Sequence, residues 1–404
     1  MNTGTEENGR LHPKAWLVIS LNALYNIAEA LCSVFVSMYF YVNSLDFRVV
    51  CAHYLALYLV TPVVFAAAGR IAKTRDRTLV FRIGLALHAV YYGSLIWLKG
   101  DSAHYAVPLG VLLGVTWGFF WAGNNTYQYD FSTSGRRDYF LGIMSSVSGA
   151  ARLAGPVVSG LVIRLAPAAE QGYQAVFTLA LVLYLAAFAL SARIPHDTGR
   201  GGFALRRALF PPREHRDWRL IMLASATLAG SFHIFSFVLA LMMFMGTGSE
   251  LKAGGFVSAQ GLVGVVAAWL VGRHVTPRTR RAFMSWGVVT LIAAGLMVAW
   301  RLDLATLIAF GFLRSVSEPL FGIPHTGVRF DVMQRTAPPG QRIEYLCAWE
   351  FPLAFGRLFT MTLLISLYTL LGMEGLRVTL VVVSFYRVLT WLILSRISIV
   401  RDAA

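Results

Sequence analysis

Six ionisable side chains of this 404-residue chain lie deep inside long apolar runs of the sequence. They are Glu29, Arg152, Arg314, Glu318, Glu350 and Arg357. A charged side chain at the centre of a membrane helix costs on the order of 2.5–3.5 kcal/mol on insertion. These six therefore need ionic partners or a wet cavity instead of lipid. Carboxylates in such places can take up and release protons, so Glu29, Glu318 and Glu350 are the predicted proton-coupling groups.

Three of the apolar runs carry polar side chains spaced three or four residues apart, which places each set on one helix face. The sets are Asn22, Asn26, Glu29 and Ser33; Trp117, Trp121, Asn124 and Gln128; and Arg314, Glu318, His325 and Arg329. Polar residues can join membrane helices by hydrogen bonds. Three such stripes, two of them matching at an offset of 201 residues, instead favour a cavity lining.

We therefore predict one substrate cavity lined from both halves of the chain. Its predicted residues are Asn22, Asn26, Glu29, Trp117, Trp121, Asn124, Gln128, Arg152, His233, Arg314, Glu318, His325, Glu350 and Arg357. Arg314 and Glu318 are one turn apart and can neutralise each other, whereas Glu350 and Arg357 are two turns apart on one face. A permanent pair would be structural, and a pair that opens on binding a solute or a proton would be a switch.

Other polar residues of the runs are open to a structural interpretation. His233 is either a cavity residue or a satisfied interior histidine. His88 and Arg82 lie on the third run, which we expect to be peripheral, and Arg82 can reach the cytoplasmic surface.

The composition predicts an integral membrane protein. The chain is 57% hydrophobic and 14% charged, whereas about a quarter of the residues of an ordinary soluble chain are charged. The net charge of +15 comes from basic residues in the turns, so their expected partner is an anionic membrane face and not nucleic acid. Cys32, Cys51 and Cys347 are not spaced like the ligands of a metal site. We expect no disulfide, no metal site and no cofactor.

Twelve apolar runs reach the length of about 20 residues that a membrane span needs. They are 15–42, 48–69, 78–98, 104–130, 138–164, 171–192, 219–246, 252–272, 281–300, 303–328, 345–371 and 375–397. The first run is too long for a signal peptide. Basic residues gather in the turns 70–77, 193–219 and 273–281, which places both termini in the cytoplasm.

The predicted fold is an all-α membrane protein of twelve transmembrane helices in two pseudo-symmetric six-helix bundles. The predicted parts are a cytoplasmic tail at 1–14, a bundle at 15–192, a basic cytoplasmic linker at 193–218, a second bundle at 219–397 and a tail at 398–404. Inside the linker, the segment FALRRALF fits either a short surface-lying helix or a flexible tether.

An internal repeat supports the two halves. Gly69 to Gly84 and Gly272 to Gly287 share Gly, Arg, Arg, Arg and Gly at one offset of 203 residues, which favours duplication over coincidence. Asp130 and Asp331 end the fourth and tenth spans on the cytoplasmic side, where we expect them to pair with the basic turns. The predicted conformational latch comprises Gly69, Arg70, Arg77, Asp130, Gly272, Arg273, Arg280 and Asp331.

Twelve spans, cytoplasmic termini, a basic central linker and the repeated turn together resemble the major facilitator superfamily, over nearly the whole chain. The family's motif G-x-x-x-D-R-x-G-R-K matches at Gly69 and Arg77, but Lys73 takes the place of its Asp and Asp76 that of its second Gly. In this chain, Asp76 or Asp130 would have to supply the missing acid of the latch. The family's intramembrane Arg on helix four is also absent, and Arg314 is its nearest counterpart.

The fifth span resembles the pattern G-x8-G-x3-G-P-x2-G-G of the family's proton-driven exporters. The chain has Gly142, Ala151, Gly155, Pro156, Ser159 and Gly160 at that spacing. Small residues let this helix press on a neighbour and bend, so the predicted hinge is Gly142, Gly155, Pro156 and Gly160. The resemblance implies export.

These observations predict a secondary transporter that works by alternating access, moving a small amphiphilic or anionic solute outward with proton coupling. We expect a monomer in a bacterial inner membrane, in contact with lipid. An importer and a lipid flippase on the same fold remain alternatives. A multi-span transferase using His325 and Asp331 is a distant one, because those residues do not share a helix face and no nucleophile elbow or phosphate loop is present.

Overall fold

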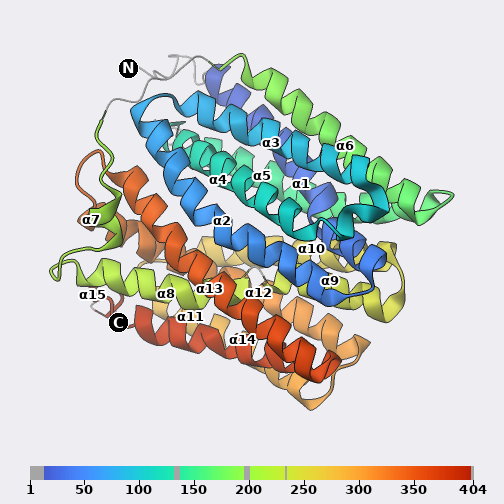
Figure 1. Cartoon of the computed structure of the whole chain (residues 1–404). Helices are drawn as coiled ribbons and strands as arrows, with labels where there is room; N and C mark the ends of the chain where they lie inside the picture. Colours follow the sequence, from blue (N-terminus) through green and yellow to red (C-terminus); the bar gives the residue numbers. More distant parts are fainter. Residues whose placement is uncertain (1–12, 132–136, 195–200, 233, 402–404) are drawn as a thin grey trace. The chain divides into compact units, whose positions relative to one another are not determined.

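The computed structural model describes residues 13–131, 137–194, 201–232 and 234–401, and all regular structure in these ranges is helical (Figure 1). Contacts within the chain divide it into two compact units. Unit 1 comprises Met1–Phe203 and Ser249–Ser258, and unit 2 comprises Ala204–Gly248 and Ala259–Ala404.

The first half of the chain forms six long helices, joined in one place by a short 3-10 helix, η1 (Lys99–Ala103). The long helices are α1 (Pro13–Ser44), α2 (Phe47–Thr74), α3 (Arg77–Leu98), α4 (Ala106–Phe131), α5 (Arg137–Leu165) and α6 (Ala169–Ser191). Each coincides with one of the first six predicted spans to within a few residues.

The second half begins with the short helix α7 (Leu205–Leu209) in the linker and ends with the short helix α15 (Ser398–Arg401). Between them lie α8 (Arg216–Phe232), α9 (Ile234–Thr247), α10 (Glu250–His274), α11 (Arg280–Trp300), α12 (Leu304–Thr336), α13 (Arg342–Leu371) and α14 (Met373–Leu394). The described residues hold eleven helices that are long and apolar enough to cross a membrane, together with the shorter apolar helix Phe237–Thr247. This arrangement agrees with a twelve-helix layout.

One boundary differs clearly from the sequence prediction. The predicted seventh span, 219–246, corresponds to α8 and α9, which are described on either side of residue 233. Helix α12 continues to Thr336, eight residues beyond the predicted end at 328. Because the ruler of about 20 apolar residues measures the hydrocarbon thickness, it misses a helix that extends past the membrane surface.

Four helix pairings recur at corresponding positions in both units, as the sequence repeat predicts. In unit 1, α1 packs on α5 and α6, and α3 packs on α4 and α6. In unit 2, α8 packs on α13 and α14, and α11 packs on α12 and α14. Figure 1 shows α8 beside α13 and α14. The predicted pseudo-symmetry of two bundles is therefore confirmed.

The last glycine of the repeated turn has a packing role in each unit. A Cβ added at Gly84 of α3 would lie 2.5 Å from the Cα of Phe120 on α4. A Cβ added at Gly287 of α11 would lie 3.0 Å from the Cβ of Phe321 on α12. Gly84 and Gly287 correspond at an offset of 203 and the two phenylalanines at 201. Glycine thus lets equivalent helices approach closely in both halves.

The linker contains a helix and not a plain tether. Helix α7 packs against α13, and the indole Nε1 of the fully buried Trp218 donates a hydrogen bond to the carbonyl oxygen of Ala208 at 3.0 Å. The backbone N–H of Ala204 also donates to Glu344 Oε1 at 3.2 Å. These bonds fasten the end of the linker to unit 2.

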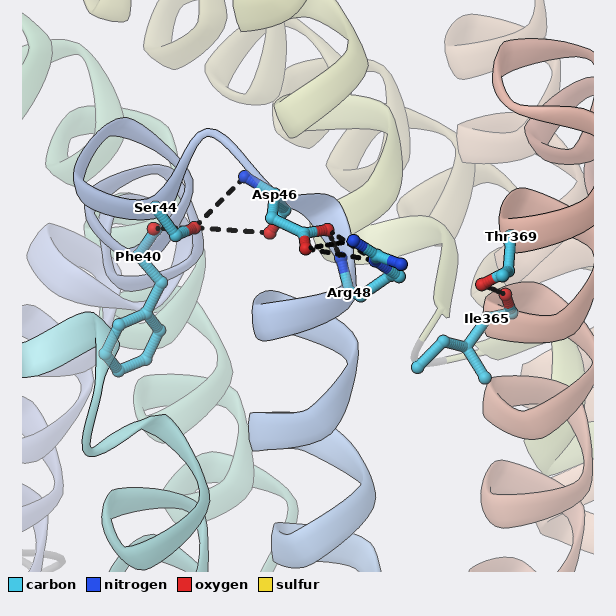
Figure 2. A network of polar contacts seen from close by, with 6 residues as sticks. All are labelled: Phe40, Ser44, Asp46, Arg48, Ile365 and Thr369. Carbon is cyan, nitrogen blue, oxygen red and sulfur yellow. Dashed lines mark hydrogen bonds and ion pairs between the residues drawn. The ribbon is translucent and has the colours of Figure 1, made fainter.

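The turn between α1 and α2 is held by its own polar side chains (Figure 2). Ser44 Oγ donates to the carbonyl oxygen of Phe40 at 2.7 Å, and Asp46 Oδ1 accepts the backbone N–H of Arg48 at 2.8 Å. Asp46 thereby caps the N-terminus of α2. Hydrogen bonding from the Arg48 guanidinium lowers the pKa of Asp46 below its usual value. Figure 2 also shows Thr369 Oγ1 bonded to Ile365 O, at 2.7 Å, within α13.

Candidate functional site

The centre of unit 2 holds an ion pair between two helices. Arg387 of α14 lies with its Nη2 at 3.0 Å from Oε2 of Glu318 on α12. The Arg387 side chain is fully buried, whereas 25% of the Glu318 side chain is exposed. Arg387 Nη1 also donates to Ser317, at 2.9 Å to Oγ and 3.2 Å to the carbonyl oxygen. Ser317 Oγ in turn donates to Gly287 O at 2.6 Å, so the pair is anchored on three helices.

Arg387 is the main residue that the sequence reasoning missed. It lies inside the predicted span 375–397 and satisfies the rule that singled out the other six intramembrane charges. Applying that rule to every span would have found it. Its partner could not have been inferred, because spacing along one helix does not reveal which neighbouring helix supplies the counter-charge.

Arg314 was expected to neutralise Glu318, its neighbour one turn away on α12. The two charges do act on each other, and the Arg314 guanidinium lies 5.5 Å from the centre of the Phe235 ring. The ion pair observed for Glu318 is nevertheless the one to Arg387. Glu318 is thus an acid with two arginines around it.

The second buried ion pair lies within α13 and was predicted from spacing. Arg357 Nη1 is 2.6 Å from Glu350 Oε1, with both side chains about nine-tenths buried. The two residues are seven positions apart, so they are separated by roughly 10 Å along the helix axis. Because both partners belong to one helix, movement of α13 against its neighbours leaves this pair intact.

A third cation of unit 2, Arg329 of α12, lies against aromatic rings. Its guanidinium carbon is 3.8 Å from the centre of the Trp349 ring and 4.8 Å from that of Phe330. The Trp349 indole is held by a 2.7 Å hydrogen bond from Nε1 to Ser225 Oγ on α8. In cation–π contacts the cation is more often arginine than lysine, and tryptophan provides the most favourable ring face.

The predicted acid of unit 1, Glu29 on α1, accepts a hydrogen bond at 3.2 Å from the Tyr184 hydroxyl of α6. Tyr184 stacks on His88 with ring centres 4.6 Å apart, and Tyr25 stacks on Phe120 at 3.7 Å. His88 is fully buried and its Nδ1 lies 2.8 Å from the carbonyl oxygen of Gly84. His88 is therefore enclosed within unit 1, where α3 packs on both α4 and α6. The peripheral place of the third span stays a prediction.

The amides of the first stripe bond to their own helix. Asn22 Nδ2 donates to the carbonyl oxygen of Val18 at 3.1 Å, and Asn26 Nδ2 donates to that of Asn22 at 2.7 Å. Among the fourth-helix residues, Asn124 is buried and Trp121 makes an edge contact with Tyr25, with ring centres 6.0 Å apart. Trp121 is thus the stripe residue of α4 that contacts α1, and it does so through Tyr25, which is not a member of the α1 stripe.

Arg152 and Arg357 lie 205 residues apart on the corresponding helices α5 and α13, but their surroundings differ. Arg152 on α5 is exposed and lies within electrostatic range of Glu29, whereas Arg357 is buried in its pair with Glu350. Four further predicted site residues, Gln128, Asp130, Gly142 and His233, have side chains or positions outside the residues that the structure describes.

At the basic turn of unit 2, Arg280 Nη1 lies 2.6 Å from Asp331 Oδ2, so the expected pairing of Asp331 with this turn is observed. Its role as a latch stays a prediction. Arg273 lies over the Trp269 ring at 5.5 Å, and a Cβ at Gly272 would meet nothing within 4 Å, so no close packing requires glycine there.

In the matching turn of unit 1, an aspartate caps the next helix. Asp76 accepts the backbone N–H of Thr78 at 2.8 Å and caps α3. Gly69 is buried and Arg70 exposed, and Arg77 begins α3. Arg82 donates to the carbonyl oxygens of Ser191 and Ile194 at the end of α6, at 3.0 and 2.8 Å, which satisfies carbonyls that a helix end leaves open.

The predicted small residues of the fifth span do allow close approach. A Cβ at Gly155 would lie 2.7 Å from the backbone of Ala30 on α1. A Cβ at Gly160 would lie 2.8 Å from the Cα of Leu251 at the start of α10. The carbonyl of Pro156 faces Gly254, also in the first turns of α10. Close packing of α5 is confirmed, and bending at these positions stays a prediction.

The sequence model described as Major Facilitator Superfamily matches residues 18–343. The chain belongs to the major facilitator superfamily. This is a family of membrane transporters and not of enzymes, so the facilitator fold and a role in membrane transport are established at that level. Among curated proteins, the chain is 28% identical over 356 residues to the uncharacterized protein YqgE of Bacillus subtilis (strain 168), covering 88% of this chain and 82% of that protein.

Solved structures share the facilitator fold at low sequence identity. A bacterial homologue of the iron transporter ferroportin, in an inward-facing state, is 16% identical with a TM-score of 0.69, covering 94% of this chain and 97% of its own. The peptide transporter POT in complex with sulfate is 15% identical with a TM-score of 0.71, covering 98% and 96%. At these identities the likeness is one of fold.

Proposed function

We propose that this facilitator exchanges a small amphiphilic anion for protons, by alternating access, with Glu318 as the group that carries the proton. The observation that supports it best is the Glu318–Arg387 pair. A fully buried guanidinium faces a carboxylate that is a quarter exposed. A proton can reach Glu318 through its exposed surface, whereas the Arg387 side chain is fully enclosed by the protein.

The geometry favours Glu318 over the other two predicted coupling acids. Glu350 is bound to an arginine of its own helix and only 11% of its side chain is exposed. Glu29 is bound to a neutral tyrosine hydroxyl, so its protonation would release no buried cation. Glu318 joins α12 to α14, and its neutralisation would therefore change the interaction between two helices.

The charges inside unit 2 support an anionic solute. The inner turns of α12, α13 and α14 carry Arg314, Arg329, Arg357 and Arg387 against Glu318 and Glu350, a surplus of two positive charges. Uncompensated charge at membrane depth is costly, and such residues usually mark a substrate path. An anion would offset this surplus.

The proposed cycle follows from these charges. Protonation of Glu318 removes the counter-charge of Arg387 and weakens the interaction between α12 and α14, which favours one access state. Loss of the proton restores the pair and favours the other access state, so that solute and proton cross the membrane in opposite directions. A ligand shifts a two-state equilibrium only through such differential interaction with the two states.

The remaining predicted roles complete the proposal. The predicted cavity residues line the solute path, Arg280–Asp331 is a latch of the cytoplasmic side, and Gly155, Pro156 and Gly160 form the hinge of α5. The exporter-like pattern of α5 supports outward transport, and the protein acts as a monomer in a bacterial inner membrane.

The test uses purified protein in proteoliposomes with 1-naphthylacetate as an anionic probe. We expect a pH gradient to drive accumulation of the probe, and Glu318→Gln to abolish accumulation while keeping counterflow exchange, because exchange needs no net proton movement. Glu350→Gln serves as the matched control acid and should leave gradient dependence in place. Gradient-driven accumulation by Glu318→Gln at the wild-type level would overturn the role of Glu318.

A further inference from the structure

The charge of Arg329 in unit 2 is paired with no carboxylate in the described residues, and aromatic rings surround it. Within the part of the chain that the structure describes, its Nε has no hydrogen-bond partner, and its close contacts are the ring faces of Phe330 and Trp349. Ring faces attract a cation but accept none of its five N–H groups. The guanidinium therefore retains hydrogen-bonding capacity for a further acceptor.

One turn earlier on the same helix, His325 offers a second unused polar atom. Its side chain is 3% exposed, and its Nε2 is buried with no hydrogen-bond partner among the described residues. Residues four apart on a helix lie on one face, so His325 and Arg329 are neighbours. Buried polar atoms are almost always bonded, and an exception calls for an explanation.

The local charge balance indicates the kind of group that would complete this place. Arg329 lies in electrostatic range of Glu350, but Glu350 is already bound to Arg357 at 2.6 Å. Arg329 and Arg357 together with Glu350 therefore leave one surplus positive charge. A planar carboxylate matches the fork of a guanidinium in charge and geometry.

We propose that Arg329 and His325 form the recognition site for the carboxylate of the transported solute, with the Trp349 ring against its apolar body. The inference rests on the proposed function and names the substrate class as an organic monocarboxylate with an aromatic or apolar body. Arg329 lies seven residues before the end of α12 at Thr336, which is roughly 10 Å along the helix. The site thus lies toward the end of α12 that carries the basic turn's partner, Asp331.

The experiment measures binding to the purified full-length chain without any gradient. The probes are 1-naphthylacetate and its neutral isostere 1-naphthylacetamide, followed by thermal shift and by the fluorescence difference between wild type and Trp349→Phe. We expect the acid to stabilise the protein and to change Trp349 emission, and the amide to do neither. Arg329→Met should weaken binding of the acid by about 10- to 150-fold, as expected for loss of hydrogen bonds to a charged group.

Matched variants separate recognition from general electrostatics and from folding. Arg335→Met removes an equal charge from an exposed position of the same helix and should bind the acid like wild type. Arg329→Lys keeps the charge without the fork and should bind with intermediate affinity. Should Arg329→Met fail to fold, the wild-type preference for acid over amide and the Lys variant still decide.

The proposal is overturned if wild type binds acid and amide equally, if Arg329→Met or Arg329→Lys binds the acid like wild type, or if Arg335→Met loses as much affinity as Arg329→Met. Binding at Arg329 and coupling at Glu318 fail separately. If Glu318→Gln binds the acid normally but still accumulates it in a pH gradient, the coupling role is wrong and the recognition site stands.

Discussion

Breaking the Glu318–Arg387 pair from each side should give unequal losses of stability. Glu318→Gln leaves a guanidinium with no exposed side-chain surface without its counter-charge. Arg387→Met instead leaves a carboxylate whose side chain is 25% exposed. The double variant removes both charges, and Met fills much of the volume of the arginine stem.

The magnitudes follow from burial. Removing one partner of a buried ion pair costs about 3–5 kcal/mol, whereas replacing both partners by uncharged groups is often nearly neutral. We expect Glu318→Gln to fall in that range. For Arg387→Met we expect about 1–3 kcal/mol, the cost of leaving a polar group without its partner, because Glu318 is less buried than Arg387. The double variant should lose less than the Gln variant alone, which corresponds to a coupling energy larger than the Arg387→Met loss of about 1–3 kcal/mol.

The assay is reversible unfolding of the three variants and wild type in mixed micelles with increasing SDS. This double-mutant cycle compares only free energies of unfolding, so it requires no assumption about transport. Additive losses in the double variant would refute the reasoning, since they would mean that the two side chains do not stabilise each other across α12 and α14.

Three further predictions concern packing, capping and the latch. Gly84→Ala should lower the free energy of unfolding by about 1–3 kcal/mol, because its Cβ would press on the α4 backbone. Gly93 is on the same helix, but a Cβ there would meet nothing within 4 Å, so Gly93→Ala should not destabilise the protein. Equal effects of the two substitutions in an unfolding titration would contradict this. The pKa of Asp46 is lowered in the folded state, so its cap contributes stability above the usual pKa and loses it as the pH falls through the folded value. Asp46→Ala should therefore lower the free energy of unfolding by about 0.5–2 kcal/mol at pH 7 and by less in acid. Asp46→Asn is the control, because its stability relative to Asp46→Ala should not change with pH. A loss in Asp46→Ala that does not depend on pH would argue against the cap. Asp331→Asn should increase alkylation of an engineered cysteine beside Arg280 without abolishing solute binding, and unchanged labelling would remove the latch role.

The spans and the pair within α13 could be predicted because they depend on residues close in sequence. The length of an apolar run indicates a membrane helix, and the seven-residue spacing of Glu350 and Arg357 indicates a shared face. The close approach of α5 also followed from local residues, since Gly155 and Gly160 have no side chain to hold a neighbour away.

Contacts between helices could not be read in this way. The partner of Glu318 is on α14, and His88 is buried on a helix that packs on α4 and α6. Both facts depend on which helices are neighbours, and neither spacing nor hydropathy contains that information. The burial of Arg152 and Arg357 differs for the same reason, since each unit surrounds the corresponding position with different side chains.

The most direct test of proton coupling at Glu318 is the proton flux that accompanies the solute. Proteoliposomes loaded with a pH-sensitive dye are mixed with 1-naphthylacetate in the absence of an imposed gradient, and the internal pH is followed for wild type and Glu318→Gln. The account predicts a solute-dependent pH change in wild type and none in the variant, while both exchange labelled probe. An equal pH change in both proteins would contradict it.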